Sequence, residues 1–400
     1  MNVCKCILSA ITVCVSIFNV NAQTYTANYA QKAAAMIING NYFDAVTYAD
    51  SAVNEQSSSV RLMLKGDAML LNGNAENAIN FYVSAEKSLP AEALFAQARA
   101  AASLGNSQQA VDALKKLFTR SNRPLVNAIL NDSLICLIKN SSEFSLFEKS
   151  IILKPWENDL LSAQRFVEKK QTLYAFESLN KIIKKYPAVH QAYFLRAKAY
   201  MIDNNTKSAL PDIEKAAQLN KNNPEYLEYE AYILNIEKKY QRAAQCLISA
   251  LDINETRIFN LINIAVNYYA AELYQQAAEY ARVALQLLPR NKDAIEIYAL
   301  TACANDDCTA ALQALNSLKS NKSAMYFKIR GDIYLKSEAY EFAINDYHTA
   351  LDLDPSLTEI YLNKGLAEYF SGNKDTARGD WETALKYKYS KAAEYLQKNR

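Results

Sequence analysis

The chain has 400 residues, of which 50% are hydrophobic and only 8 are glycine and 8 proline. So little glycine and proline excludes a loop-rich β architecture, and this much apolar material can bury a large core. The 44 basic and 42 acidic side chains nearly cancel. Without a basic excess there is no electrostatic footprint for nucleic acid or for an anionic membrane, so we expect neither as a partner.

Residues 1–22 have the order of a secretory signal peptide. Lys5 is their only charged residue, an apolar run extends from residue 7 to residue 20, and Val20-Asn21-Ala22 is a small-residue cleavage pattern before Gln23. The run is too short for a membrane span, so we expect no transmembrane segment after signal removal and an exported protein, periplasmic or secreted, in the cell envelope. An uncleaved signal anchor is the alternative. A lipoprotein anchored at Cys14 is disfavoured, because Val13 stands where a small residue is expected.

Alanine recurs through the chain at a step of 34 residues, and fixed-period self-similarity of this length indicates a repeat architecture. The first series is Ala163, Ala197, Ala231, Ala265 and Ala299. The second series is Ala175, Ala209, Ala243, Ala277 and Ala311, and the third is Ala216, Ala250 and Ala284. A small residue at a fixed place in every unit predicts two helices that cross closely, because a larger side chain would push their backbones apart.

The unit at residues 258–291 shows how the pattern predicts a helical hairpin. One set of apolar residues recurs at three- and four-residue steps and predicts one helix face, namely Leu261, Ile264, Ala265 and Tyr268. After a turn at Ala271-Glu272, a second set predicts the facing helix, namely Tyr274, Ala277, Ala281 and Ala284. Pro289 ends that helix. Each hairpin keeps apolar surface to spare, and stacking the next hairpin on it buries that surface.

These units resemble the tetratricopeptide repeat. Residues 324–357 contain its pattern nearly whole, in Gly331, Tyr334, Tyr340, Ala343, Tyr347, Ala350 and Pro355. Residues 59–92 contain Leu62, Gly66, Gly73, Ala78, Tyr82, Ala85 and Pro90, and residues 358–391 contain Tyr361, Gly365, Gly372, Ala377, Trp381 and Ala384. The resemblance implies an all-α fold, a right-handed α-α superhelical solenoid of about eleven such hairpins. The composition and this style of exported repeat are also similar to those of Bacteroidota proteins.

The units fall into two arrays. Residues 26–123 form an N-terminal array of three units, and residues 156–389 form a C-terminal array of seven. Between them, residues 124–155 read as a degenerate unit and a possible joint, because Asn131 and Phe144 replace the small residues. Pro211 lies inside a predicted second helix and predicts a bend. Residues 390–400 predict a closing helix that covers the exposed end of the array.

Catalytic chemistry finds no support in the sequence. The two histidines, His190 and His348, lie in distant units, and no glycine-rich phosphate loop or calcium loop is present. We therefore expect no enzyme, no catalytic residue, no metal site and no cofactor.

Cys303 and Cys308 flank a predicted turn, so in an oxidising compartment they could form a disulfide. Two separate buried thiols or a redox pair are the alternatives. Cys136 and Cys246 lie on apolar helix faces, and we expect both thiols to be buried.

The resemblance implies that first helices line a concave groove that holds a peptide or a helix. The corresponding places here are rich in aromatic and amide groups, which suit a binding groove. They are Phe194, Lys198, Met201, Tyr229, Tyr232, Phe259, Asn263 and Tyr269. Packing between neighbouring units is the competing role for each of these residues.

We therefore expect a non-enzymatic scaffold of the cell envelope with a protein or peptide partner. An accessory subunit of an outer-membrane assembly or glycan-uptake complex is the alternative. The family's clamp for a chaperone C-terminal carboxylate is not expected, because Lys328 and Asn363 match two places but Asp332 replaces an Asn and a further unit is missing.

Overall fold

The computed structural model describes residues 26–120, 123, 126–318 and 322–398, so the predicted signal peptide lies outside the described residues. Within these ranges all regular structure is helical. The N-terminal helices are α2 (Tyr29–Ile38), α3 (Tyr42–Glu55), α4 (Ser59–Leu71), α5 (Ala75–Ala85), α6 (Pro90–Ser103), α7 (Ser107–Phe118), α8 (Val126–Leu130), the 3-10 helix η1 (Ile135–Ile138) and α9 (Ser142–Ser150). The next are α10 (Glu157–Glu168), α11 (Thr172–Lys185), α12 (His190–Ile202), α13 (Thr206–Leu219), α14 (Pro224–Ile236), α15 (Tyr240–Ile253), α16 (Phe259–Ala270) and α17 (Tyr274–Leu287). The last are α18 (Lys292–Ala304), α19 (Cys308–Asn316), α20 (Ala324–Lys336), α21 (Tyr340–Leu353), α22 (Ile360–Phe370), α23 (Lys374–Lys386) and α24 (Lys391–Lys398).

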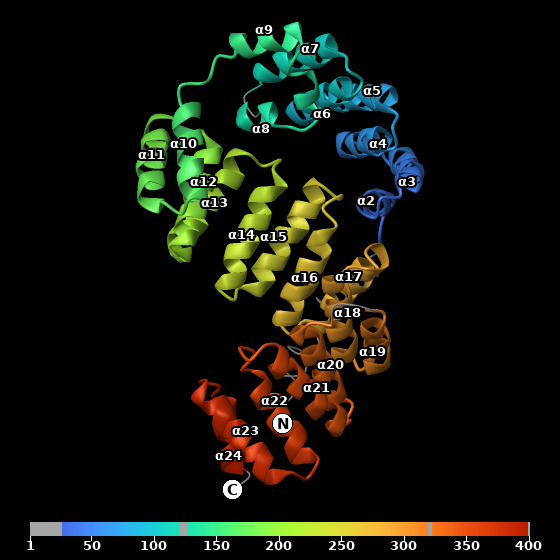
Figure 1. The fold of residues 1–400 in the computed structure, drawn as a ribbon, viewed down its shortest axis with the longest axis vertical. Coiled ribbons are helices and arrows are strands. Elements are labelled where there is room, and N and C mark those ends of the chain that lie inside the picture. The colour runs from blue at the N-terminus through green and yellow to red at the C-terminus, as the bar shows by residue number, and fades with distance from the viewer. Residues whose placement is uncertain (1–25, 121–122, 124–125, 319–321, 399–400) are drawn as a thin grey trace, which may run out of the picture.

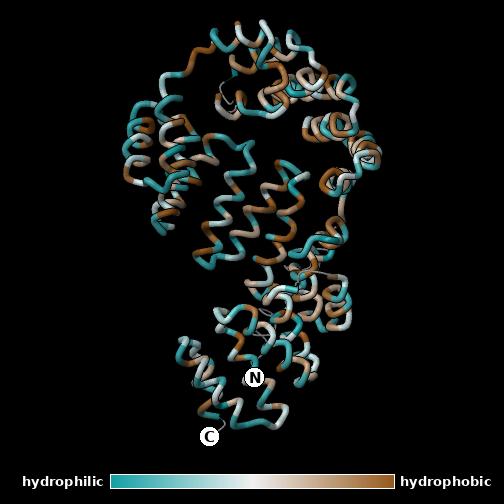
Figure 2. The backbone as a smooth tube through the Cα atoms, in the orientation of Figure 1, coloured by the Kyte–Doolittle hydropathy of each residue, from teal (hydrophilic) through white to brown (hydrophobic). Residues whose placement is uncertain are grey.

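Consecutive helices pack in pairs, and each pair packs on the next, except that α9 does not pack closely on α10. The prediction of an all-α solenoid of stacked helical hairpins is therefore confirmed, while the number of repeat units stays a prediction. Figure 2 shows hydrophobic and hydrophilic positions following one another in short stretches along the helices. This pattern is typical of helices that are buried on one side and exposed to solvent on the other.

The small residues lie where the two helices of a hairpin cross. Gly365 on α22 faces Trp381 on α23, and a Cβ atom added at Gly365 would lie 2.5 Å from Nε1 of the indole. Gly331 faces Tyr347 in the same way, with a Cβ-to-ring distance of 2.8 Å. The large ring on the second helix therefore fills the space that the small residue on the first helix leaves, and the two residues act as one packing unit.

Outside residues 126–150, the turn between the two helices of each hairpin contains one residue in the left-handed region of backbone space, and so does the turn before α24, at Lys388. Four of these residues are glycine, and the others are not: Gly40, Gly73, Gly105, Gly372, Lys170, Asn204, Lys238, Glu272, Asp306, Glu338 and Lys388. In the first turn, Gly40 has φ +75° and the amide of Asn41 donates to the carbonyl oxygen of Met36 at 2.9 Å. This closure ends the first helix and lets the second begin at once.

The degenerate unit predicted at residues 124–155 departs from the hairpin pattern. In place of one long first helix there are the short α8 and η1, with a turn between them. Asp132 accepts hydrogen bonds in that turn from the amides of Leu134 and Ile135, at 3.0 and 3.2 Å. Phe144 of α9 is buried against this irregular segment, so the unit keeps a core without the small residues of its neighbours.

Two further expectations concern helix α13 and the C-terminal end. Pro211 lies in the second turn of α13, which continues through it to Leu219. At the end of the chain, α24 packs on α23: Ala392 is fully buried, and the ring of Tyr395 lies 5.4 Å from that of Trp381. This helix covers the last hairpin, as the function of a closing helix requires.

The solenoid curves until its start meets its middle. Figure 1 shows α2, α3 and α4 returning to the region of α15, α16 and α17, while α18 to α24 extend away from the ring that results. Helix α2 packs against α17, and Ala30 of α2 and Ala281 of α17 belong to one apolar cluster. The N-terminal array is therefore not a free arm on the predicted joint.

Candidate functional site

Helices α12 and α14, which are the first helices of their units, contribute to the inner side of the ring. On α12, Phe194 is 8% exposed, and its ring centroid lies 4.9 Å from that of Tyr226 and 5.4 Å from that of Tyr229. The ammonium of Lys198 lies 4.0 Å from the centroid of Phe194. Met201 packs beside this cluster. Burial raises the pKa of Tyr229 to about 12, so its phenol is neutral. Most of this aromatic surface is used in packing α12 against α14.

Exposed apolar residues lie farther along the same face, on α14 and α16. Tyr232 is 54% exposed and Ile236 48% on α14, while Phe259 is 47% and Val266 40% exposed on α16. Asn263 is exposed on α16 between the last two. On each helix these positions are three or four residues apart, so they share one side of the helix. We refer to these five residues as the inner apolar face.

Tyr269 differs from the other predicted groove residues. Its ring lies 5.4 Å from that of Tyr274, at the start of the second helix of its own unit. Burial raises the pKa of its phenol. It therefore packs within its hairpin.

A cavity of about 1510 Å³ lies inside the ring, between the N-terminal array and the helices α12 and α14. Its wall on one side includes the residues Ser57, Ser58, Ser59, Ser84, Lys87, Ser88 and Glu92. Its wall on the other side includes His190, Phe194, Lys198, Asn220, Asn222, Asn223, Tyr226, Glu228, Asn254 and Arg257. Of the eight predicted groove residues, Phe194 and Lys198 line this cavity and the other six do not. We call this space the ring chamber.

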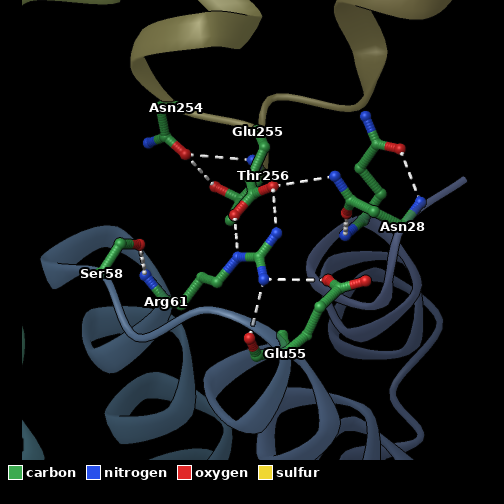
Figure 3. Close-up of polar contacts among 9 residues, drawn as sticks. Asn28, Glu55, Ser58, Arg61, Asn254, Glu255 and Thr256 are labelled. Carbon is green, nitrogen blue, oxygen red and sulfur yellow. Dashed lines mark hydrogen bonds and ion pairs between the residues drawn. The ribbon is translucent and has the colours of Figure 1, made fainter.

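The ring is closed by the packing of α2 against α17 and by one polar cluster, which Figure 3 shows. Arg61 of α4 donates from Nε and Nη2 to the two carboxylate oxygens of Glu255, at 2.6 and 3.2 Å. Glu255 lies in the turn between α15 and α16 and also accepts a hydrogen bond of 2.8 Å from Asn28. Nη1 of Arg61 donates to the carbonyl oxygen of Ala52 and to Glu55 in its own array. One arginine therefore joins segments 194 positions apart.

His190 begins α12 at the edge of the chamber. Its Nδ1 lies 2.6 Å from the hydroxyl of Tyr226. Burial and then the positive charge of Lys154 lower the pKa of His190 to about 4, so the imidazole is neutral at physiological pH. Among the described residues, no three His, Cys, Asp or Glu side chains converge as a metal site would require.

The two places that match the family's carboxylate clamp are occupied by an internal carboxylate. Lys328 donates to one oxygen of Asp332 at 3.1 Å, and Asn363 donates to the other at 2.9 Å. The hydroxyl of Tyr347 donates to that second oxygen at 2.7 Å. Asp332, which replaces an Asn of the family's clamp, therefore accepts the hydrogen bonds that a bound carboxylate would need from Lys328 and Asn363.

The four cysteines of the described residues have different surroundings. Cys303 and Cys308 are joined across the turn between α18 and α19, with their Cα atoms 4.0 Å apart. The oxidation state of this pair in the protein stays a prediction. Cys246 is half-buried, and burial followed by the charge of Glu230 raises the pKa of its thiol to about 12. The expectation of a buried Cys136 is wrong: it is exposed, because η1 is too short to bury more than one side.

Sequence reasoning missed a set of polar pairs inside the hairpins. In three units a base on the first helix pairs with an aspartate on the second, 16 positions later. The pairs are Arg196–Asp212, Arg330–Asp346 and Lys364–Asp380, with closest distances of 2.7, 2.6 and 2.8 Å. The fixed spacing of base and acid was a signal that could have found them. The Arg61–Glu255 pair has no such signal.

Comparisons with known proteins agree with the fold. A family model described as TPR repeat matches residues 331–369, and another described as tetratricopeptide repeat matches residues 190–223. Tetratricopeptide repeat protein 6 of Homo sapiens is 26% identical over 176 residues, which is 44% of this chain. The match covers 32% of that relative, so this chain spans about a third of its length.

Two solved structures are also similar. A tetratricopeptide repeat protein from Parabacteroides merdae superposes with a TM-score of 0.54 at 18% identity, covering 61% of this chain and 98% of that chain. The C-terminal part of a TPR repeat-containing protein from Cytophaga hutchinsonii has a TM-score of 0.43 at 18% identity, covering 59% and 99%. The first of these likenesses supports the fold and nothing beyond it.

No helix in the described part of the chain combines the length and the apolar character that crossing a membrane requires. Both family matches fall on stacked hairpins, and the match at residues 331–369 includes Gly331 and the ring of Tyr347 that packs against it. The chain therefore contains tetratricopeptide repeats at residues 190–223 and 331–369, within a fold that is similar to that of a solved tetratricopeptide repeat protein.

Proposed function

We propose that this protein is a non-enzymatic scaffold of the cell envelope that binds a protein or peptide partner on its inner apolar face. Tetratricopeptide repeats mediate protein–protein interaction, and this general role applies to the chain. The envelope location rests on residues 1–22, whose order is that of a signal peptide.

The observation that carries the proposal is the exposure of Tyr232, Ile236, Phe259 and Val266 on two neighbouring first helices. Stacking buries most apolar surface of a repeat array, so four exposed apolar side chains on one face require a reason. Aromatic residues are the usual anchors of protein interfaces, and Asn263 beside them can hydrogen-bond to a partner's backbone.

A photo-crosslinking amino acid placed at position 232 tests this proposal in the native host. The matched control position is Leu173, which is 75% exposed on α11, a second helix outside the ring. We expect a discrete adduct from position 232 and none from position 173. With the purified partner, Tyr232→Ala/Asn263→Ala should weaken binding about tenfold or more, since an interface anchor contributes at least about 1.4 kcal/mol.

Equal crosslinking at positions 232 and 173 would contradict the proposal. So would a double variant that binds the partner with the same affinity as the parent and Leu173→Ala. Either outcome would remove the inner apolar face as the binding site. The envelope location has a separate test, which is the N-terminal peptide of the purified protein: mass spectrometry should find Gln23 first.

A further inference from the structure

The hairpin of α18 and α19 lies between the ring and the C-terminal arm, which we define as helices α20 to α24 (Figure 1). Its second helix is short: α19 has 9 residues, whereas α17 before it and α21 after it each have 14. A shorter second helix offers less surface to the next hairpin. Contacts outside the helix faces therefore contribute more to this junction, and motion between its two sides is expected where such contacts are lost.

Lys336 of the arm binds the turn between α18 and α19. Its ammonium donates to the carbonyl oxygens of Cys303 and Ala304, at 2.5 and 3.1 Å, and lies 2.9 Å from the carboxylate of Asp306. Both carbonyl groups belong to the last turn of α18, where the helix dipole is negative and a cation is favourable. One side chain of the arm therefore caps a helix of the preceding hairpin.

The same turn also binds the ring. The side-chain amide of Asn305 donates to the carbonyl oxygen of Tyr274, the first residue of α17, at 2.9 Å. The next residue, Asp306, has φ +69°, in the left-handed region that a residue other than glycine occupies at a cost. The turn therefore keeps this shape only while its surroundings hold it there.

The Cys303–Cys308 bond encloses the groups of the turn that make these contacts. The carbonyl group of Cys303, the side chain of Asn305 and the carboxylate of Asp306 all belong to the loop that the bond closes, whose ends have their Cα atoms 4.0 Å apart. A covalently closed short loop has few conformations available. The bonded turn therefore presents its acceptors to Lys336 in one arrangement, and the reduced turn has others open to it.

We propose that the Cys303–Cys308 pair is a redox-controlled contact that fixes the C-terminal arm to the ring. While the bond is closed, the turn binds Lys336 on one side and Tyr274 on the other, and the arm keeps one direction. When the bond is opened, both contacts weaken, and the arm moves about the apolar contact that remains between α19 and α20. The inference rests on the export that is part of the proposed function, because such a bond persists in an oxidising compartment.

A dithiol opens the bond by thiol–disulfide exchange. Its thiolate attacks Sγ of the half-buried Cys308, since Cys303 is only 4% exposed, and the electron pair of the broken S–S bond goes to Cys303, which then takes up a proton. The second thiol of the reductant displaces Cys308 in the same way, which leaves two cysteine thiols and one disulfide on the reductant. Sγ of Cys308 lies 3.8 Å from the carbonyl oxygen that Lys336 binds, so a positive charge lies near the bond and favours the leaving thiolates.

Single-molecule energy transfer across the junction tests the inference on the full chain. Dyes are attached through non-natural amino acids at Lys181 on α11 and Glu382 on α23, whose side chains are 71% and 58% exposed. We expect one narrow distance distribution in the oxidised protein, a broader one after dithiothreitol, and the narrow one again after oxidation by glutathione disulfide. Cys303→Ala/Cys308→Ala should be broad from the start and indifferent to dithiothreitol, with helical circular dichroism unchanged.

Lys336→Met separates the contact from the bond. It removes the ammonium and leaves both cysteines in place, so we expect a broad distribution in the oxidised protein. Lys328→Met is the matched control on the same helix, because Lys328 pairs with Asp332 inside α20 and does not reach the turn. This control should stay narrow when oxidised and broaden on reduction, as the parent does.

Three results would overturn the inference. One is an unchanged distribution after reduction, with mass spectrometry showing both thiols free, since the bond would then stabilise only its own turn. Another is a narrow distribution in oxidised Lys336→Met. The third is labelling of Cys303 and Cys308 by iodoacetamide in intact cells without reductant. None of these touches the crosslinking at position 232 or the N-terminal peptide at Gln23, so the proposed function succeeds or fails separately.

Discussion

Arg123 and Glu157 form a buried ion pair at the start of the C-terminal array. The Nη2 atom of Arg123 lies 2.7 Å from each carboxylate oxygen of Glu157, and both side chains are 2% exposed. The guanidinium also lies 4.5 Å from the ring centroid of Phe118, at the end of α7. The two residues are 34 positions apart, one repeat length, so the pair spans the degenerate unit predicted as a joint. The contact ties the two arrays together at that place.

Replacing Glu157 with alanine should therefore destabilise the protein strongly. The change leaves the buried Arg123 without its carboxylate, and breaking a buried pair in this way costs about 3–5 kcal/mol. Urea denaturation followed by circular dichroism measures the loss of stability. Because repeat arrays need not unfold in one step, we expect the first unfolding transition to move to a lower urea concentration. Asp159→Ala on the same helix is the control: its partner Lys181 is 71% exposed, so it should cost less than about 1 kcal/mol. Equal losses in the two variants would contradict a special role for the buried pair.

Two glycines of the last unit, Gly365 and Gly379, should change the stability of the protein in opposite directions when each is replaced by alanine. At Gly365 a Cβ would meet Nε1 of Trp381 at 2.5 Å and the carbonyl oxygen of Ala377 at 3.1 Å, so Gly365→Ala should lose about 1–3 kcal/mol by overpacking. At Gly379 a Cβ would meet nothing within 4 Å, so Gly379→Ala should gain about 0.5–1 kcal/mol from helix propensity. Thermal unfolding of the two variants beside the parent measures both signs. A stabilising Gly365→Ala would show that the indole can move aside.

His190 should make stability depend on pH between its ordinary pKa of 6.5 and about 4. In that window the unfolded chain binds a proton at this residue and the folded chain does not, so stability falls as pH is lowered through it. Below about 4 the contribution is fully lost, and above 6.5 it is fully present. His190→Gln should reduce this slope, as measured by urea denaturation at several pH values. The chain has only 2 histidines, so proton NMR can assign the resonance of His190 by its loss in the variant. A titration near 6.5 for the resonance that the variant loses would contradict the burial of His190.

The thiols should react with iodoacetamide in a fixed order. Cys136 is exposed and should react first. Cys246 should react slowly at neutral pH, because only the thiolate reacts and its pKa is raised to about 12. Cys303 and Cys308 should react only after a reductant is added. Peptide mass spectrometry at timed intervals gives the order, and labelling of all four residues without reductant would show that Cys303 and Cys308 are not bonded.

The hairpins of this protein were predictable from the sequence because their contacts are local. Ala197, Ala231 and Ala265 lie one repeat apart, and each helix meets its partner within a few tens of residues, so periodicity alone encodes the crossing. The same holds for the pairing of Gly331 with Tyr347, which are 16 positions apart and repeat as a pattern. Polar pairs such as Lys364–Asp380 have the same 16-residue spacing, so they too could have been predicted from the sequence.

Only the tertiary structure decided which predicted groove residues remain open. Phe194 and Tyr232 both lie on first helices and were both predicted to line the groove, yet Phe194 is 8% exposed and Tyr232 54%. The difference depends on neighbouring units, since Tyr226 and Tyr229 of the next hairpin cover Phe194. The sequence alone determined the stacked helical hairpins through its repeat period, and from local charge order it predicts an exported-type leader, which stays a prediction. Only the tertiary structure decided the closure of the ring at Arg61 and Glu255, because that contact depends on small rotations summed over every hairpin between them, and no local pattern records such a sum.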